Sequence, residues 1–506
     1  MTPLSTISRK GLYPHLILAG IILFNLLIHI PFLLLDTFGE MDAARLANSS
    51  LYASFQSEDP YYINPVPVFS APLYIEILRF GINHGWIDTT NIISCMTIAS
   101  FLASAVVTAM VYLFMLNLTG SILAAASAGI ILQFNPTFWH SSIYGFPTIL
   151  SAALFLISLL LFQSALGNQK KPQKLIRFLG SLAFFMIAIL IKIDSILAAA
   201  VFCLPVWNLD TPRKRKITWS AILLLVVMGC FFFYSNYAGS LLSEYSAKFY
   251  GQWNQNFPLE PKFLFSIINL EIAFKSTGLV TIPLAAAAII LLVRKNQYGT
   301  IIFWLVLASL PIILFWGLRE GNSARHNLIA IIFLYMVLSL PMGTSYRQVW
   351  SLALVLMCLI NYFAFKPQAN PYVQSGRLIK NSLLLSEASS NLHKYGKIIT
   401  VLPEKKIAFI GGGPWHPFYE FEQINRNSIQ SFHKDIDPET GLFTTRIIYD
   451  DTVKEFVWFY TAPGLTELIQ IVENGYFLII DETRTAEEIY AIPRLQNHWT
   501  TLGELE

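Results

Sequence analysis

The sequence has few charged residues and few cysteines for its length. Only 13% of its 506 residues are charged, 55% are hydrophobic, and the mean hydropathy is +0.54. Such a chain cannot cover its apolar surface as a soluble globular protein, so lipid must act as the solvent for most of it. All four cysteines lie in hydrophobic stretches, which excludes a disulfide framework in the polar loops. The small net charge of +3 gives no reason to expect a nucleic-acid partner.

Long hydrophobic runs predict a polytopic α-helical membrane protein with about eleven transmembrane helices. The segments lie near 15–35, 92–116, 121–134, 147–166, 178–191, 195–209, 217–235, 276–293, 299–317, 326–342 and 349–365. The first run lacks a small-residue cleavage site, so we expect a retained anchor and not a signal peptide. Residues 1–366, including a long first loop at 36–91, are predicted to form one transmembrane domain.

The basic residues predict the orientation of the chain. Alternate short loops carry thirteen Lys and Arg residues against one acid, Asp210, and we therefore place these loops and the N-terminus in the cytoplasm. The opposite side receives loop 36–91, loop 236–275 and the tail. Loop 36–91 has seven acids against two basic residues and contains two amphipathic stretches that suit the membrane interface.

The tail predicts a small extracytoplasmic α/β domain at 367–506, because its composition changes sharply. Strands are expected at 407–413, 445–449, 455–460 and 475–480, with a helix at 465–474. The triple glycine that begins at Gly411 is followed by a proline-rich turn instead of a helix, so it does not indicate a nucleotide site.

An acidic cluster follows the first hydrophobic run and is the strongest candidate for an active site. Asp36, Glu40, Asp42 and Arg45 lie within ten residues. A carboxylate there can act as the general base for a hydroxyl group, while Arg45 orients it or binds a phosphate. The structural alternative is that Asp42 caps the following helix and Arg45 is a surface partner.

Lys192 and Asp194 lie between two hydrophobic segments that must cross the membrane twice. Each arm has about 14 predicted residues, or roughly 21 Å, which is less than the ~30 Å hydrocarbon core. Ionisable residues at that depth are costly, and Lys192 suits a lipid-linked phosphate with Asp194 holding it. Alternatively, the two form a structural ion pair, or Lys192 extends to the interface.

Two further groups of polar and aromatic residues are predicted on the outer side. Arg319, Arg325 and His326 suit an anionic headgroup or act as interfacial anchors. Trp139, His140 and Tyr144 are predicted to lie in the second outer loop, as a sugar-stacking platform or part of an aromatic belt. The scattered histidines show no ligand spacing, so no metal site or other cofactor is predicted, and a divalent metal has no support.

The arrangement resembles the GT-C superfamily of integral-membrane glycosyltransferases, which includes protein O-mannosyltransferases and aminoarabinose transferases. The resemblance rests on the span pattern and on the segment from Phe38 to Ala47, which is similar to the family's acidic motif after the first span. Many relatives have an adjacent Asp–Glu pair, whereas this chain has Glu40 and Asp42 separated by Met41.

The resemblance implies an inverting transfer of a sugar from a polyprenyl-phosphate donor to a hydroxyl of a glycan, lipid or protein. Asp42 is then the base, with Glu40 as the second choice. Lys192, Arg319 or Arg325 would lie near the carrier phosphate. A bacterial inner (plasma) membrane location is expected, because a glycan on the sequon at Asn48 would obstruct the candidate active-site helix.

Three other functions stay open at this point. A lipid or solute transporter or flippase predicts broken helices in corresponding halves of the chain. A polysaccharide polymerase or ligase of the envelope predicts Arg and His in a large late loop, and here that loop is short. A non-catalytic assembly partner is the third.

Overall fold

The computed structural model describes residues 12–30, 46, 50, 71–87, 91–143, 145, 147–167, 171–240, 259–319 and 324–365, and five strands between 406 and 480. Each of the eleven predicted hydrophobic segments contains a helix. Among the described residues, six helices are long and apolar enough to cross a membrane, or eight if each of two bent pairs is one span. The remaining three predicted segments correspond to shorter apolar helices, Tyr13–His29, Ile193–Trp207 and Leu328–Gly343. The protein is therefore an integral membrane protein of the α-helical, polytopic class.

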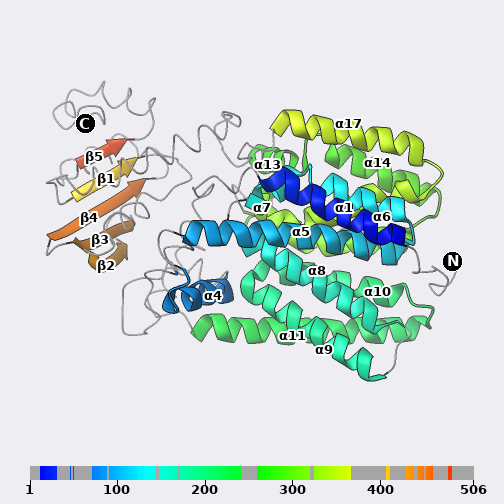
Figure 1. Cartoon of the computed structure of the whole chain (residues 1–506), viewed down its shortest axis with the longest axis horizontal. Coiled ribbons are helices and arrows are strands. Elements are labelled where there is room, and N and C mark those ends of the chain that lie inside the picture. The colour runs from blue at the N-terminus through cyan, green and yellow to red at the C-terminus, as the bar shows by residue number, and fades with distance from the viewer. Residues whose placement is uncertain are drawn as a thin grey trace.

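The helices lie largely side by side in one bundle (Figure 1). The α-helices are α1 (Leu12–His29), α4 (Pro72–Asn83), α5 (Ile92–Thr119), α6 (Ile122–Leu132), α7 (Pro136–Ile143), α8 (Pro147–Ala165), α9 (Lys171–Ile191), α10 (Cys203–Trp207), α11 (Arg213–Ser240), α13 (Ile267–Thr277), α14 (Thr281–Arg294), α15 (Gly299–Gly317), α16 (Leu328–Ser339) and α17 (Arg347–Phe365). Four segments are 3₁₀-helices, namely η2 (Ile193–Phe202), η3 (Pro261–Phe265), η4 (Ala324–Asn327) and η5 (Leu340–Gly343).

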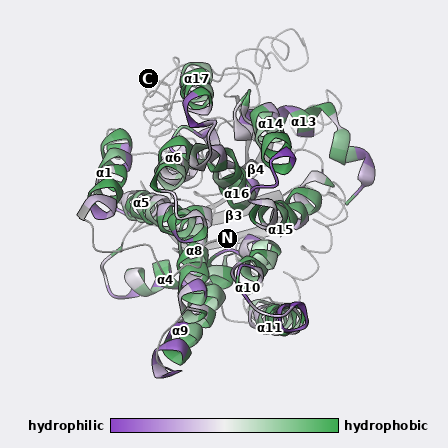
Figure 2. Ribbon diagram, turned by 90° about the vertical axis from the view of Figure 1, so that its right-hand side faces the viewer, coloured by the Kyte–Doolittle hydropathy of each residue, from purple (hydrophilic) through white to green (hydrophobic). Residues whose placement is uncertain are grey.

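Helix α16 forms the centre of the bundle. It packs against α5, α6, α8, α14, α15 and η2, and nearly all of its side chains are buried. Figure 2 shows it enclosed by hydrophobic helices. A helix that is apolar all round must be buried on every side, which explains why this short segment needs no polar face.

Two spans are bent, and their bends are joined to each other. The axes of α6 and α7 differ by 65°, and those of α13 and α14 by 75°. The Nδ2 atom of Asn135, at the first bend, donates to the carbonyls of Ser276 (2.9 Å) and Thr277 (3.1 Å) at the second. The hydroxyl of Tyr335 from α16 donates to the Thr277 carbonyl at 2.9 Å. The carbonyls of Ser276 and Thr277 lie at the end of α13, where the α-helical hydrogen bonds stop. The side chains of Asn135 and Tyr335 provide the donors that these buried carbonyls need in a region without water.

Helix α4 confirms the second amphipathic stretch of the first loop. Tyr74 is buried and donates from its hydroxyl to the Gly145 carbonyl at 3.2 Å, and burial raises the pKa of this phenol. Ile77 and Phe80 are exposed on the opposite face. The helix therefore attaches to the turn before α8 by one face and leaves an apolar face uncovered, as expected at an interface. The first stretch lies outside the described residues, apart from helical, buried Leu46 and Ser50.

Five strands follow the bundle and form one mixed sheet, which supports the predicted α/β tail. They are β1 (Lys406–Ile410), β2 (Ile429–Ile436), β3 (Phe443–Tyr449), β4 (Thr452–Phe459) and β5 (Phe477–Ile480). Their order is β2-β3-β4-β1-β5, with β1 parallel to β4 and β5, and with β3 antiparallel to β2 and β4. In Figure 1 the sheet lies beyond the end of the bundle that holds α4, α7 and α13. The predicted helix at 465–474 lies outside the described residues.

Candidate anion site at a helix break

The structure describes some of the predicted site residues and not others. Glu40, Asp42, Arg45 and Tyr144 lie outside the described residues, as does the side chain of Arg325. Asp194 and His326 are brought together, Lys192 acts electrostatically on Asp194, and Arg319 lies at the end of the neighbouring helix α15. Trp139 and His140 lie on α7.

The site is built where α9 ends and η2 begins. Lys192 has an extended backbone, with φ −160° and ψ 119°, between Ile191 of α9 and Ile193 of η2. Both Lys192 and Asp194 are buried, at 9% and 4% exposure. Helix α9 begins at Lys171, seven residues before the predicted segment, so its 21 residues rise about 31 Å and reach across a bilayer. The prediction that this arm is short is therefore wrong.

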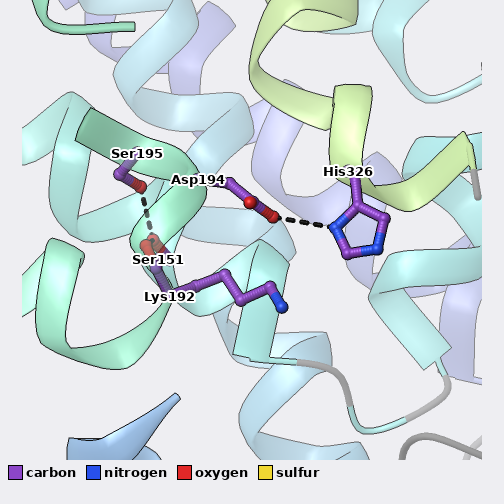
Figure 3. Close-up of polar contacts among 5 residues, drawn as sticks. All are labelled: Ser151, Lys192, Asp194, Ser195 and His326. Atoms are coloured by element: carbon purple, nitrogen blue, oxygen red, sulfur yellow. Dashed lines mark hydrogen bonds and ion pairs between the residues drawn. The ribbon is translucent and has the colours of Figure 1, made fainter. Parts of the chain in front are cut away.

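Asp194 pairs with His326. The Asp194 Oδ2 and His326 Nδ1 atoms are 3.0 Å apart, although the residues are 132 positions apart in the chain (Figure 3). An ionised carboxylate can only accept, so Nδ1–H of the imidazole donates. His326 lies on η4, which packs against α7, α13, α15 and α16. Asp194 therefore hydrogen-bonds to His326, while the positive charge of Lys192 acts on it without a direct bond.

Lys192 remains available to a ligand. Among the described side chains, none forms an ion pair or hydrogen bond with the Lys192 ammonium. Its side chain and that of Asp194 both extend from the break toward His326 (Figure 3). Lys192 and Asp194 interact electrostatically without a direct bond, and the ammonium has three donors that suit the oxygens of a phosphate.

Trp316 organises the cationic side chains. Its indole ring stacks on the His326 imidazole, with ring centroids 3.7 Å apart and planes inclined by 16°. The Arg319 guanidinium lies 5.6 Å from the same indole centroid and 5.1 Å from that of Phe315. Stacking on aromatic rings stabilises cations in a region poor in water. One tryptophan thus contacts two of the predicted anion-binding residues.

The position of Arg319 is fixed through its backbone. Asn269 of α13 is buried, and its Nδ2 atom lies 2.8 Å from the carbonyl of Arg319 and 3.0 Å from that of Gly317. These carbonyls lie at the C-terminal end of α15, where a helix leaves acceptors without internal partners. The end of α15 is therefore attached to α13, and the Arg319 side chain, at 8% exposure, is held inside the protein.

Lys192 and His326 lie beside one described carboxylate, Asp194, and Arg319 lies against the same tryptophan ring as His326. Lys192 and Arg319 are permanent cations, and protonation of His326 adds a further positive charge. A phosphate can accept charge-assisted hydrogen bonds from each of these side chains. Among the described side chains, this is the arrangement best suited to a phosphate.

Two of the residues predicted to stack on a sugar, Trp139 and His140, do not lie in a loop. Helix α7 contains Trp139 and His140, and every side chain of this helix is buried, so the prediction of an outer loop is wrong. The centroids of the Trp139 and His29 rings are 4.3 Å apart, and His29 is the last residue of α1. Because α7 also packs against η4, the end of α1 lies one helix away from His326, and the acidic segment follows it.

No cluster of three or more His, Cys, Asp or Glu side chains suited to a metal occurs in the described part of the chain. The residues that sequence reasoning missed are Trp316, Asn269 and Ser151. A pair of aromatic residues next to a predicted anion-binding arginine is the signal that points to Trp316. Asn269 and Ser151 resemble ordinary polar residues in the sequence, and only their contacts distinguish them.

Comparison with known proteins gives no match to a protein-family model or to a curated protein. Three solved structures illustrate the similarity found. The Archaeoglobus fulgidus oligosaccharyltransferase, in complex with zinc and sulfate, has 12% identity and a TM-score of 0.47, over 79% of this chain and 61% of that one. Its archaeal AglB complex with an inhibitory peptide and a dolichol-phosphate has 10% identity and a TM-score of 0.44, over 81% and 64%.

The third is ArnT from Cupriavidus metallidurans bound to undecaprenyl phosphate, with 14% identity and a TM-score of 0.49, over 80% of this chain and 84% of that one. The chain spans about three fifths of the length of the archaeal enzyme.

Proposed function

We propose that the protein is an inverting membrane glycosyltransferase that takes a sugar from a polyprenyl-phosphate donor and transfers it to an acceptor hydroxyl. The observation that carries this proposal is the buried group of Lys192, Arg319 and His326 around Asp194. The leaving group of such a donor is a phosphate on a long apolar chain. A cationic site inside a bundle of membrane helices provides for both parts of that molecule.

The reaction needs a base and a charged leaving-group site. The acceptor oxygen attacks the anomeric carbon while Asp42, or Glu40 in its place, takes the hydroxyl proton. The bond from the anomeric carbon to the phosphate oxygen breaks, and the lipid phosphate leaves with the electron pair on the opposite face, which inverts the configuration. Lys192 and Arg319 stabilise the charge that develops on the phosphate, so no general acid is required.

The position of α1 supports a base in the acidic segment. His29, at the end of α1, contacts α7, and α7 packs against the helix that carries His326. Asp36 follows His29 by seven residues. Trp139 lies beside His29 and stays a predicted contact of the sugar ring. Arg45 and Arg325 are further candidates for contact with the donor phosphate.

We place the reaction at the extracytoplasmic face of a bacterial inner membrane, with the N-terminus in the cytoplasm. The basic residues that begin with Lys171 and Arg213 lie in the first turns of α9 and α11, and the break at Lys192 follows the other end of α9. The positive-inside rule therefore puts the cationic site on the outer side. The acceptor is a glycan, lipid or protein.

A transporter or flippase is the second candidate, because two spans are bent, as that class predicts. The hydrogen bonds from Asn135 to Ser276 and Thr277 oppose it, since they tie the two bends together instead of leaving them free to move. A polymerase or ligase would use the same lipid-phosphate chemistry at this site.

The test is sugar transfer by the purified full-length protein in proteoliposomes, supplied with radiolabelled polyprenyl-phosphate mannose or aminoarabinose. We expect transfer, or slow release of sugar to water, that Asp42→Asn or Glu40→Gln reduces by about 10²-fold or more. Asp210→Asn, at the opposite end of the bundle, is the matched control. Unchanged rates in both site variants would contradict the assignment of the base. Donor uptake across the vesicle membrane without any transfer would favour the transporter.

A further inference from the structure

The break between α9 and η2 is closed by a side chain from a third helix. The Ser151 hydroxyl of α8 lies 2.9 Å from the carbonyl oxygen of Ala188 and 3.3 Å from that of Lys192. It also lies 2.5 Å from the hydroxyl of Ser195. Both serines are buried, at 1% and 0% exposure. Figure 3 shows this contact to the left of the side chains of Lys192 and Asp194.

These contacts have a clear physical cause. A helix that ends inside a membrane leaves carbonyl oxygens without partners, and water is not present to replace them. At this end, the Lys192 N–H still donates to the Ala188 carbonyl at 2.9 Å, and the Ser195 N–H approaches the Lys192 carbonyl at 3.3 Å. Both carbonyls therefore have an N–H donor. The Ser151 hydroxyl adds a bond from α8, sharing its one hydrogen between the two carbonyls while it accepts from the Ser195 hydroxyl. These contacts fix the rotation of the single extended residue, Lys192, from which the ammonium projects.

From this geometry we propose that Ser151 and Ser195 are positioning residues of the anion site, which direct Lys192 and Asp194 toward the donor phosphate. This inference rests on the proposed function. Neither hydroxyl touches a phosphate bound between Lys192 and His326. Ser151 acts by contacting the Lys192 carbonyl, and Ser195 acts by bonding to the Ser151 hydroxyl. Together they hold the two side chains on either side of Ile193. Their loss leaves the Lys192 backbone free to rotate, so the ammonium no longer has one fixed direction.

The same pair of helices contains a natural control. Ser158 of α8 and Ser181 of α9 are also buried and also bond across the helix contact, with the Ser158 hydroxyl 2.6 Å from the Ser181 carbonyl. The reverse bond, from the Ser181 hydroxyl to the Ser158 carbonyl, measures 2.9 Å. This pair joins two regular helices away from the break. It stabilises the fold in the same way as Ser151, without a connection to Lys192.

The experiment compares Ser151→Ala and Ser195→Ala with Ser158→Ala in the proteoliposome assay, with the melting temperature in detergent measured in parallel. We expect similar losses of thermal stability in the three variants. The KM for the lipid-linked donor should rise about tenfold for Ser151→Ala and Ser195→Ala, and less than about twofold for Ser158→Ala. Ser151→Thr keeps a hydroxyl and should keep most of the donor affinity.

A double-mutant cycle tests whether Ser151 acts through Lys192. The effect of Ser151→Ala on donor KM should largely vanish when Lys192 is already Met, because nothing is left to position. Equal effects of Ser151→Ala with and without Lys192, or a KM that changes no more than in Ser158→Ala, would overturn the inference and leave a purely structural role. Failure of the proposed function looks different, because the unmodified protein then transfers no lipid-linked sugar at all.

Discussion

Replacing Lys192 by methionine separates the contribution of this residue to binding from its contribution to stability. The ammonium is buried, and no described carboxylate pairs with it directly. Asp194 keeps its contact with His326 when Lys192 is removed. Methionine has a similar length and no charge, so it relieves a buried cation without opening a cavity. The unliganded variant should therefore melt at the same temperature as the unmodified protein, or higher.

Donor affinity should change in the opposite direction. Removing one partner of a buried charge-assisted contact weakens binding by about 2–5 kcal/mol. We expect the lower end, about 2 kcal/mol or about 30-fold in Kd, because Arg319 and His326 remain to bind the phosphate. Polyprenyl phosphate alone serves as the ligand, and its Kd follows from the ligand-induced rise in melting temperature.

The control is Lys262→Met, which removes an exposed lysine that pairs with Glu260 at a distance of 2.5 Å. It should leave both the Kd and the melting temperature nearly unchanged, since exposed ion pairs contribute little. A Lys192→Met protein that melts lower and binds polyprenyl phosphate normally would refute the reasoning. Lys192 would then be a stabilising partner of Asp194 and not a ligand-binding group.

Two further substitutions test other parts of the structure. Trp316→Leu removes the ring that His326 stacks on and should weaken polyprenyl-phosphate binding about tenfold. The control Trp304→Leu, on the same helix, should leave this binding unchanged. Equal effects of the two substitutions would contradict a role for the stacked ring. Gly278→Ala should lower the free energy of unfolding by about 2 kcal/mol or more, since φ is 101° and the new Cβ would lie 2.4 Å from Asn361. Chemical denaturation in detergent measures this, and a variant as stable as the parent would show that the bend tolerates a side chain.

The sequence predicted the spans well because each required only a run of apolar residues. It placed the start of α9 too late, since Lys171, Lys174 and Arg177 lower the local hydropathy although they lie in the first turns of the helix. Long basic side chains reach the membrane surface from inside a helix, so charge alone does not mark where the helix begins. The interpretation of Trp139 as a loop residue failed for a related reason. Helix α7 is short and follows a bend, so it lacks the length by which a helix is recognised.

The strands show the same limit. Four of the five were predicted from apolar runs in the tail. The missed strand, Ile429–Ile436, is an edge of the sheet and contains His433, Lys434 and Asp435. An edge strand pairs on one side only and often carries charged residues, so it lacks the apolar signal. The division into two domains at residue 366 stays a prediction.

The candidate site was predicted in part. Lys192 and Asp194 were chosen because ionisable residues are costly in a membrane, and that argument needs no structure. His326 was chosen with Arg319 and Arg325 as a group that suits an anionic headgroup. The structure brings Asp194 and His326 together across 132 residues, which no local pattern contains. The roles of Asp42 and Glu40 as the base stay predictions.

The 3₁₀-helix η2 has a larger rise per residue than an α-helix, so it spans a greater distance with the same number of residues. Its ten residues rise about 2.0 Å each, or about 20 Å in total, where an α-helix would cover about 15 Å. With the five residues of α10, the arm reaches about 27 Å, close to the thickness of the hydrocarbon layer. A stretched pitch thus compensates for a segment that is too short to match its bilayer. Lys192 therefore lies about 5 Å farther from the end of η2 than it would if the same ten residues formed an α-helix.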